Sequence, residues 1–269
     1  MKPSVRDITA VVPVRNGAGL LPACLESLTM SGVAEIIVVD GLSTDSSRDI
    51  ARRYGATVLS DDGLGLPVAR LRGVERARTR WVALVDADVV FPSDAMAALF
   101  QEYLDGRYGA LQAGLQSVSG PGYWGRALSF HHRTGRSRNW FGVMATLMER
   151  DLIRNIGFDE KFRSGEDIDL RWRLRRAGYR IGVSRGVFVE HRFAGDDFAF
   201  ARDQFLMDGE GLGRMSRNHG LRGLILLLLP MAAGIRGVGL SVACRQPQWL
   251  LYFVAFIGYN YRGVLKGLV

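Results

Sequence analysis

Residues 81–92 read WVALVDADVVFP, and this stretch decides the fold. The run before Asp86 is entirely apolar, which is typical of a strand buried on both faces of a sheet. Asp86 and Asp88 follow directly, separated by Ala87, and the chain then returns to apolar residues. The stretch therefore predicts a buried strand that ends in a turn bearing two carboxylates.

The same alternation of strand and helix occurs upstream. Apolar runs at residues 8–14, 35–40 and 57–59 are followed by helical spacing near 20–28, 45–54 and 68–77. Such alternation predicts an α/β fold, with a Rossmann-like, mostly parallel central sheet and helices on both faces. Ligands of these sheets bind at the carboxyl ends of the strands, where we expect Asn16, Asp40 and Asp86 to converge.

Beyond residue 106 the pattern is less regular. We expect a strand at 110–118, a Gly-rich basic loop at 120–142, a strand at 143–149, a helix after Ser164, and a strand pair near 179–183 and 187–190. The loop contains Arg133, Arg136, Arg138 and Trp140. We interpret it as a solvated loop, and closure over a diphosphate or an anionic lipid head is the alternative.

Positive charge is concentrated at the end of the chain. The formal net charge is +8, and residues 211–269 contain seven Arg or Lys and no Asp or Glu, which leaves +1 for residues 1–210. Two regions are therefore predicted, a near-neutral α/β domain at 1–210 and a basic, apolar, helical region at 211–269. The near-neutral first region argues against nucleic acid as the partner.

The basic region contains apolar runs at 224–235 and 249–257. A helix that crosses a membrane needs about 20 apolar residues. Because prolines and arginines interrupt both runs, we expect this region to lie in the membrane interface rather than to cross the membrane. A helical core element or a dimer surface is the alternative interpretation.

Two further features indicate a cytosolic setting. Cys24 and Cys244 are far apart in the sequence and form neither a zinc spacing nor a disulfide framework. The N-terminus enters the first strand without the apolar stretch of a signal peptide. We therefore expect a peripheral or monotopic protein at the cytoplasmic face of the membrane.

The carboxylates of Asp86 and Asp88 carry the first chemical prediction. Burying two like charges is costly unless a cation compensates them. Mg²⁺ or Mn²⁺ bridging to a diphosphate provides that compensation, because these ions prefer a few carboxylates together with phosphate oxygens. An ordinary turn containing Asp is the alternative interpretation.

Two other acidic positions have both a structural and a functional interpretation. Asp40 ends the strand at 35–40 and precedes Thr44 and Asp45, one of which is expected to cap the next helix. The Asp40 carboxylate is placed to accept hydrogen bonds from a nucleobase or ribose. Ser164 and Asp167 have the spacing of a capping box, and Asp167 with Arg171 has the spacing of an ion pair.

Five segments together resemble the inverting glycosyltransferase family 2, which has the GT-A fold. They are VVPVRN at 11–16, VVDGLSTD at 38–45, Ala69-Arg70, Asp86-Ala87-Asp88 and Gly165-Glu166-Asp167, and the resemblance covers about residues 6–195. It implies a nucleotide-diphosphate sugar donor, and implies that the nucleotide is held by Pro13, Val14, Arg15, Asn16 and Asp40. It also implies that Arg70, Asp86 and Ala87 lie at the diphosphate and that Asp88 binds the metal.

The same resemblance makes Asp167 the general base for an acceptor hydroxyl, with Glu166 helping to bind the acceptor. This role suits inversion, which needs one carboxylate on the face opposite the leaving group. His191 ends the run at 187–191 and is either a further metal ligand or a structural histidine. Departures from the family pattern at Gly17, Gly41 and Leu71 leave the nucleobase open.

Processive members of the family carry a Gln-x-x-Arg-Trp motif after the base, and residues 204–208, QFLMD, do not match it. We therefore predict transfer of a single sugar, with a glycan or lipid-linked acceptor at a membrane surface.

Two other classes of function stay open. A nucleotide-sugar pyrophosphorylase or a Rossmann oxidoreductase usually needs a Gly-rich phosphate loop, a pattern that residues 13–19 lack. A non-enzymatic basic module that binds membranes or nucleic acid predicts steeply salt-dependent binding.

Overall fold

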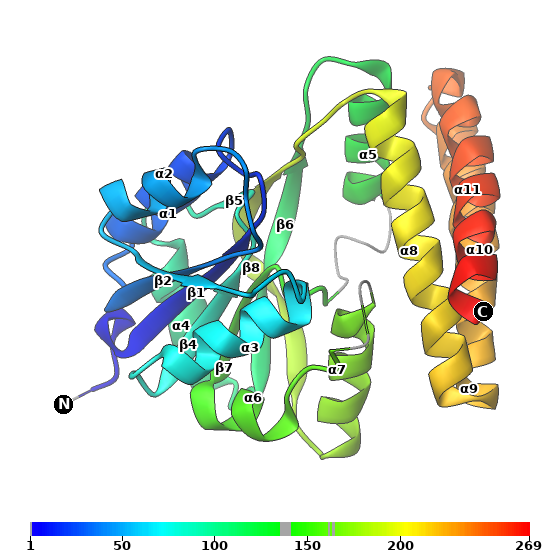
Figure 1. Ribbon diagram of the computed structural model, residues 1–269. Helices are drawn as coiled ribbons and strands as arrows, with labels where there is room; N and C mark the ends of the chain where they lie inside the picture. The colour runs from blue at the N-terminus through cyan, green and yellow to red at the C-terminus, as the bar shows by residue number, and fades with distance from the viewer. Residues whose placement is uncertain (1, 135–140, 161, 163–164) are drawn as a thin grey trace. The chain divides into compact units, whose positions relative to one another are not determined.

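The computed structural model describes residues 2–134, 141–160, 162 and 165–269 (Figure 1). The expected loop residues Arg136, Arg138 and Trp140, and the expected cap Ser164, lie outside the described residues. The chain divides into two compact units. The first contains residues 1–116, 139–161 and 170–192, and the second contains residues 117–138, 162–169 and 193–269.

A single mixed sheet organises the first unit. Its strands are β1 (Ile8–Val14), β2 (Glu35–Asp40), β3 (Thr57–Ser60), β4 (Trp81–Val85), β5 (Val89–Val90), β6 (Ala110–Val118), β7 (Ala145–Glu149) and β8 (Ile181–Arg192). They are ordered β3-β2-β1-β4-β7-β6-β8-β5. The first four strands are parallel, whereas β7 is antiparallel to β4 and β6, and β5 is antiparallel to β8. The predicted α/β fold is confirmed, with its parallel strands gathered in one half of the sheet.

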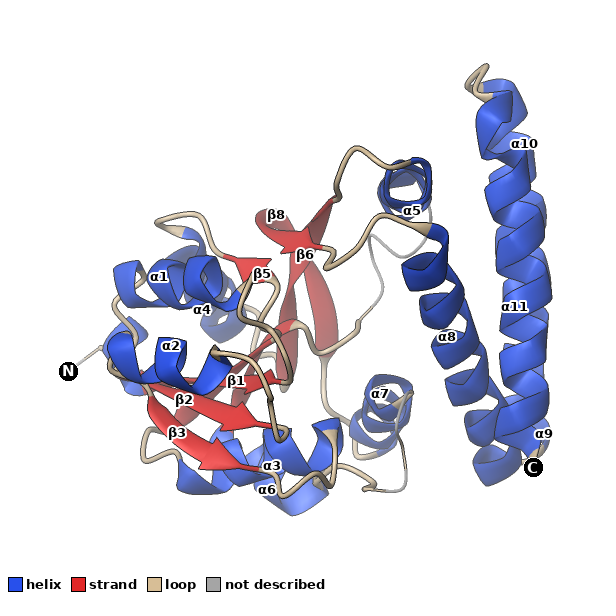
Figure 2. Cartoon of the chain, turned by 45° about the horizontal axis from the view of Figure 1, so that its top comes forward, coloured by secondary structure: helices blue, strands red, loops and turns tan. Residues whose placement is uncertain are grey.

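The parallel strands bury alternate residues on opposite faces. In β1, for example, Ala10 and Val12 join one core while Val11 joins the other. Figure 2 shows the helices on the two sides of the strands. The first core is covered by α1 (Leu21–Met30), α2 (Ser47–Arg53) and α4 (Ala95–Asp105), and the second by α3 (Leu66–Arg76), α6 (Arg150–Ile156) and the later part of α7 (Glu166–Arg176). Burial on both faces explains the unbroken apolar runs of the sequence.

The second unit is helical. Besides the first turn of α7 it contains α5 (Tyr123–Thr134), α8 (Phe198–His219), α9 (Leu221–Leu224), α10 (Leu229–Ala243) and α11 (Leu250–Leu268). Helices α8 and α11 lie along each other, and α10 packs on α11 (Figure 1). The core is an aromatic cluster whose buried members include Phe205, Tyr252 and Phe253.

Glycines bring α8 and α11 into backbone contact. A Cβ atom at Gly209 of α8 would collide with the carbonyl oxygen of Asn260, and one at Gly213 would collide with that of Val264. Gly263 and Gly267 of α11 meet the backbone of α8 in the same way. Both helices thus carry glycines four residues apart, a spacing that lets two helices approach closely.

Several elements differ from the sequence expectation. Helix α5 (Tyr123–Thr134) occupies part of the stretch at 120–142 that was expected to be a loop; in it Ala127 and Leu128 are buried and Gly125 packs on Asp196. One continuous strand, β8, replaces the expected strand pair. The Oγ atom of Ser184 accepts hydrogen bonds from the N–H groups of Gly186 and Val187, so the stretch expected to separate two strands lies within β8.

Among the described residues, one stretch is long and apolar enough to cross a membrane by length and composition alone. It is Ile225–Ala243, with 19 residues and a mean hydropathy of 1.9, and 28% of its apolar part is buried. The prolines and arginines that were expected to interrupt the first apolar run do not end its helix. Pro230 lies in the first turn of α10, where no N–H is needed, and the helix continues past Arg236. Core helices of soluble proteins pass the same criterion. Residue 210 lies within α8, and the division of the chain into 1–210 and 211–269 stays a prediction.

Candidate functional site

The turn at Asp86–Asp88 leaves the end of β4. The Asp86 N–H donates to the carbonyl of Met144 at 2.9 Å, and the Val89 N–H donates to the carbonyl of Asp86 at 3.0 Å. The chain then forms β5, in which Val89 lies opposite His191 of β8. Because the Arg192 N–H also donates to the Asp88 carbonyl at 2.8 Å, the backbone fixes Asp88 beside the end of β8.

Asp88 and His191 therefore come together. His191 Nε2 lies 3.3 Å from Asp88 Oδ2. The other carboxylate oxygen, Asp88 Oδ1, is buried without a hydrogen-bond partner among the described residues. Burial alone lowers the pKa of His191, but the hydrogen bond and the negative charge of Asp88 outweigh it and raise the pKa above its usual value.

Asp86 is held by Arg70. The guanidinium NH2 of Arg70 donates to Asp86 Oδ1 at 2.8 Å, and Arg70 is only 1% exposed. The guanidinium also lies 5.9 Å from the centre of the Phe158 ring. Burial raises the pKa of Asp86 and the charge of Asp88 adds to this effect, while Arg70 opposes it. Arg70 thus compensates one of the two carboxylates.

A glycine of α3 helps to place Arg70. One turn after Arg70, a Cβ atom at Gly73 would collide with the side chain of Val11 in β1. The helix therefore lies directly on the sheet at this point, and Arg70 on the same face of α3 is buried.

The loop after β1 is tied to the loop after β2 by Asn16. Asn16 Oδ1 accepts from the Thr44 N–H at 2.8 Å, and the Asn16 N–H donates to Ser43 Oγ at 2.9 Å. Its φ of 51° is in the left-handed region, which Asn tolerates. Asn16 therefore orders the two loops. Of the other expected nucleotide residues, Pro13 and Val14 are buried in β1 and Arg15 is exposed.

Asp40 is 2% exposed at the end of β2. Its Oδ2 accepts from the Ser43 N–H at 3.1 Å and lies 3.7 Å from Arg48 Nε. Its Oδ1 is buried without a hydrogen-bond partner among the described residues. A buried carboxylate oxygen that lacks a donor costs free energy, so this oxygen is suited to a hydrogen bond from a ligand.

Asp45 rather than Thr44 hydrogen-bonds to the start of α2, whose N-cap position is Ser46. Asp45 Oδ1 accepts from the N–H of Ser47 at 3.0 Å, and its Oδ2 accepts from the Ala18 N–H at 2.9 Å. Hydrogen bonds, first that of the Ser47 hydroxyl, lower the pKa of Asp45. Asp45 thus also fastens the loop that follows β1.

The residues present fit a hard divalent ion that shares its ligands with a phosphate. No cluster of three or more His, Cys, Asp or Glu side chains suited to a metal occurs in the described part of the chain. Asp88 and His191 nevertheless offer a carboxylate and an imidazole side by side. Mg²⁺ and related ions are commonly held by one or two carboxylates and complete their coordination with phosphate oxygens and water.

Glu166 and Asp167 open α7 in the second unit. Glu166 is 6% exposed, and Asp167 is half-buried, with its Oδ1 accepting from the Ile168 N–H at 2.8 Å. Asp169, in the same turn, is buried and lies 3.2 Å from His219 Nε2. The structure thus gathers three carboxylates in one helical turn, and Asp86 and Asp88 belong to the other unit.

Two residues that no sequence pattern predicted contact the Asp86–Asp88 turn or Arg70. Cys24 lies beneath the turn, with Sγ 3.6 Å from the Asp86 carbonyl, and burial raises the pKa of this thiol. Phe158 lies against Arg70. Neither had a usable signal, because an apolar residue on a helix or in a loop is ordinarily only part of a core.

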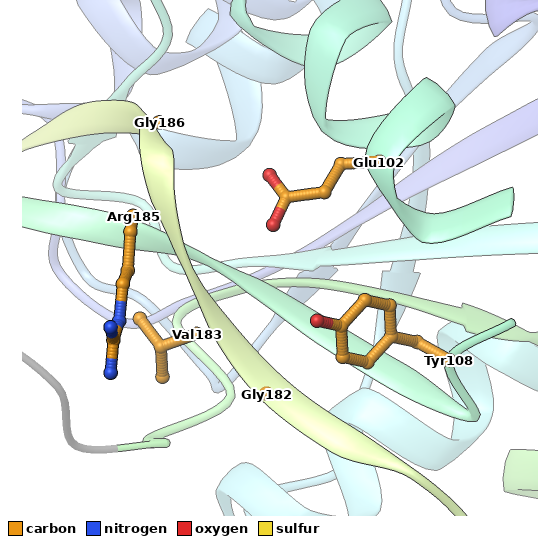
Figure 3. Close-up of a pocket in the computed structure, with 6 residues that line it drawn as sticks. All are labelled: Glu102, Tyr108, Gly182, Val183, Arg185 and Gly186. Atoms are coloured by element: carbon orange, nitrogen blue, oxygen red, sulfur yellow. The ribbon is translucent and has the colours of Figure 1, made fainter. Parts of the chain in front are cut away.

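A hollow of 640 Å³ lies elsewhere on the first unit (Figure 3). It is lined by Glu102, Tyr108, Gly182, Val183, Arg185 and Gly186. The carboxylate of Glu102 accepts a hydrogen bond from Ser184 Oγ at 2.5 Å, and Arg185 is separated from His191 by about 20 Å along β8. The hollow is therefore distinct from the Asp88 site.

Residues 9–166 match the family model described as glycosyl transferase family 2. The chain belongs to this family. It is 30% identical over 205 residues to the pre-mycofactocin glycosyltransferase of Mycobacterium tuberculosis, covering 70% of this chain and 43% of that protein. It is 34% identical over 148 residues to the 4,4'-diaponeurosporenoate glycosyltransferase of Staphylococcus aureus, covering 52% and 40%. The present chain thus spans less than half the length of these two relatives.

Solved structures resemble the family 2 chain over its length. The mannosyltransferase PcManGT from Pyrobaculum calidifontis, in complex with GDP-Man and Mn²⁺, has a TM-score of 0.68 at 18% identity and covers 100% of this chain and 89% of that one. TarS 1-349 of S. aureus, in complex with UDP-GlcNAc, has a TM-score of 0.56 at 16% identity and covers 97% and 89%. At these identities the likeness establishes the fold, and the expected GT-A fold is confirmed.

Proposed function

We propose that the protein is a metal-dependent, inverting glycosyltransferase that moves one sugar from a nucleotide-diphosphate sugar to an acceptor hydroxyl on a lipid-linked or membrane-proximal glycan intermediate. The observation that carries the proposal is the 3.3 Å approach of His191 to Asp88 at the end of a family 2 sheet. The neighbouring carboxylate, Asp86, is already paired with Arg70, which leaves Asp88 and His191 for a metal ion.

The donor nucleotide is assigned to the loops after β1 and β2. Asp40 Oδ1, which is buried and lacks a donor among the described residues, accepts an N–H or O–H from the nucleobase or ribose. Pro13, Val14 and Arg15 line the nucleotide, and Asn16 holds their loop to that of Ser43. These loops lack the Gly-rich phosphate-binding pattern that a pyrophosphorylase or oxidoreductase uses.

The diphosphate is assigned to Ala87, Asp88, His191 and the Arg70–Asp86 pair. Asp88 and His191 would hold Mg²⁺ or Mn²⁺, which supplies positive charge to a leaving nucleoside diphosphate. The Mn²⁺ and GDP-Man in the P. calidifontis mannosyltransferase support this assignment.

Asp167 is assigned as the general base. Its carboxylate accepts the proton of the acceptor hydroxyl as that oxygen bonds to the anomeric carbon and the bond from that carbon to the diphosphate breaks. One displacement of this kind inverts the anomeric configuration and forms no covalent intermediate on the enzyme. Glu166, beside the base, is assigned to the acceptor.

Nucleotide binding gives the central test. A ligand that binds only the folded protein stabilises it by about 2.7 kcal/mol at 100 times its dissociation constant. We expect GDP, UDP or their sugars to raise the melting temperature only in the presence of Mn²⁺ or Mg²⁺. A screen in which no nucleoside diphosphate shifts the protein under any metal condition contradicts the proposal.

Membrane association at the cytoplasmic face is the second part of the proposal. Leu221, Ile225 and Leu228 are 88%, 65% and 64% exposed, and residues 211–269 contain no acidic side chain. Exposed aliphatic side chains within a basic region favour an anionic lipid surface. The alternative, a dimer surface, predicts a change of oligomeric state instead.

Vesicle binding tests this part. Deleting residues 221–269 would remove Tyr252 and Phe253 from the core of the second unit, so substitutions are the cleaner variants. The triple variant Leu221→Ser, Ile225→Ser, Leu228→Ser should lose co-sedimentation with anionic phospholipid vesicles. Met30→Ser, at a 69% exposed residue of the first unit, is the matched control. Unchanged vesicle binding by the triple variant counts against the membrane assignment.

A further inference from the structure

His219 ends α8 and contacts the acidic turn of α7. Its Nε2 lies 3.2 Å from Oδ1 of Asp169, and the two side chains are only 15% and 7% exposed. A polar contact this well shielded from water contributes more than a surface pair, because losing one partner leaves the other buried without it. The contact joins residues separated by 50 positions in the sequence.

A second contact holds the same turn against α8. Gly165, directly before the turn, has a φ of 86°, in the left-handed region that favours glycine. A Cβ atom at Gly165 would lie 3.2 Å from the Cα of Gly211. The acidic turn is thus attached to α8 at two places, by backbone packing at Gly211 and by a side-chain hydrogen bond at His219.

Asp167 lies between the two buried acidic residues of the attached turn. Glu166 and Asp169 are three residues apart, lie on one face of α7 and are both buried, whereas Asp167 between them is half-buried. A small rotation of this turn would move the Asp167 carboxylate along an arc. General-base catalysis depends on such placement, since a displacement of about 1 Å can cost a factor of 10² in rate.

The charge of the turn adds to the need for a partner. Glu166, Asp167 and Asp169 all lie in the first turn of α7. The positive end of the helix dipole favours carboxylates there, but three of them also repel one another. His219 Nε2 lies within hydrogen-bond distance of the buried Asp169, and Asp167 is the most exposed of the three.

We propose that His219 is a positioning residue, which orients the α7 turn through Asp169 so that Asp167 faces its substrate correctly. This inference rests on the proposed role of Asp167 as the base. His219 itself is assigned no contact with donor, acceptor or metal. The amide of glutamine can donate to Asp169 much as Nε2–H does, so His219→Gln should preserve the function that His219→Ala removes.

The kinetic test uses release of the nucleoside diphosphate from GDP-mannose or UDP-N-acetylglucosamine by the full chain with Mn²⁺. We expect His219→Ala to lower kcat on the order of ten-fold with the donor KM unchanged, because only the base moves. His219→Gln should restore most of the rate, and Asn218→Ala, at the exposed neighbour, is the control. A wild-type kcat in His219→Ala, or a fall in His219→Gln as large as that in His219→Ala, overturns the proposal.

Hydrogen exchange separates this proposal from the proposed function. The amides of residues 165–169 should exchange faster in His219→Ala than in the wild type and in His219→Gln, whether or not any sugar nucleotide is turned over. Unchanged exchange in His219→Ala overturns the positioning role. If exchange responds as expected while Asp167→Asn keeps full activity, the contact between the helices stands and the assignment of the base fails.

Discussion

Nε2 of His191 lies 3.3 Å from Oδ2 of Asp88, and the register of β5 against β8 brings the two residues together. Val89 pairs with His191, so the aspartate just before the two-residue strand β5 meets the histidine near the end of β8. The metal site that we propose for this pair depends on a short stretch of sheet, and the two proposed ligands should act as a unit.

The first prediction concerns this pair. Asp88→Asn and His191→Ala should each abolish the Mn²⁺-dependent part of nucleoside diphosphate binding, because each removes one of the two adjacent side chains proposed to bind the metal. Isothermal titration with UDP and GDP, with and without Mn²⁺, measures the effect. Asp94→Asn is the control, because Asp94 is an exposed aspartate that directly precedes α4. Equal metal dependence in Asp88→Asn and the wild type would remove Asp88 from the metal site.

The second prediction concerns Asp40. Asp40→Asn keeps one carbonyl oxygen for the Ser43 N–H but replaces the other acceptor with an amide NH₂. We expect the dissociation constant for the nucleoside diphosphate to rise about ten-fold, which corresponds to about 1.4 kcal/mol and to the loss of one hydrogen bond to a charged group. Asp49→Asn, whose side chain is 75% exposed, should bind like the wild type. An unchanged affinity in Asp40→Asn would mean that Oδ1 does not meet the nucleotide.

Sequence patterns predicted the parallel half of the fold because the relevant signals are local. The apolar run before Asp86 and that before Asp40 are each short, unbroken and followed by a helix, so strand ends and carboxylates could be placed together. The pairing of Val89 with His191 is not local, since it depends on which strands of a mixed sheet become neighbours. A metal role for His191 therefore had no support in the sequence beyond family resemblance.

The remaining features could not be predicted because they depend on which side chains become neighbours in the folded chain. Asn16 was expected to bind the nucleotide. In the structure its side-chain oxygen accepts a hydrogen bond from the Thr44 N–H, and the carboxylate oxygen without a partner among the described residues is Oδ1 of Asp40. Helix α5 was missed because glycines and arginines suggested a loop, whereas burial of Ala127 and Leu128 against α8 and α11 decides its structure. Tertiary contacts of this kind override local composition.

The third prediction tests the base. Asp167→Asn retains the size of the side chain but removes its ability to take a proton, so sugar transfer should fall by a factor of roughly 10² to 10⁴ while nucleotide affinity stays the same. Glu160→Gln, at an exposed acidic residue in the preceding loop, is the control. Turnover measured together with nucleotide titration separates the two effects. A parallel loss of nucleotide affinity in Asp167→Asn would indicate a donor-side role instead.

The fourth prediction is a dependence of stability on pH. His131 Nδ1 lies 3.1 Å from the hydroxyl of Tyr252, and burial, with a smaller effect from the charge of Arg236, lowers the pKa of His131 to about 4. The unfolded chain, with an ordinary histidine pKa near 6.5, binds the proton more readily. This contribution to stability is therefore complete above about pH 6.5 and is lost as the pH falls towards 4.

Urea unfolding between pH 4 and pH 7.5 measures this effect. The wild type should lose up to about 3 kcal/mol across that range relative to His131→Gln, which cannot titrate, because other titrating groups contribute equally to both proteins. Parallel stability curves for the two proteins would contradict the prediction, because they would mean that the pKa of His131 is the same in the folded and unfolded states.

The fifth prediction concerns the contact between α8 and α11. Gly209→Ala places a methyl group against the carbonyl of Asn260, and since that neighbour is backbone, the helices must separate. We expect a loss of about 1–3 kcal/mol in the free energy of unfolding, the usual cost of overpacking. Gly258→Ala is the matched control, because Gly258 is exposed in α11 and a Cβ atom there meets no described atom within 4 Å. Alanine at that position should stabilise the helix by about 1 kcal/mol. Opposite signs for the two substitutions would locate the close contact at Gly209, and a neutral or stabilising Gly209→Ala would mean that the helices pack less closely in solution.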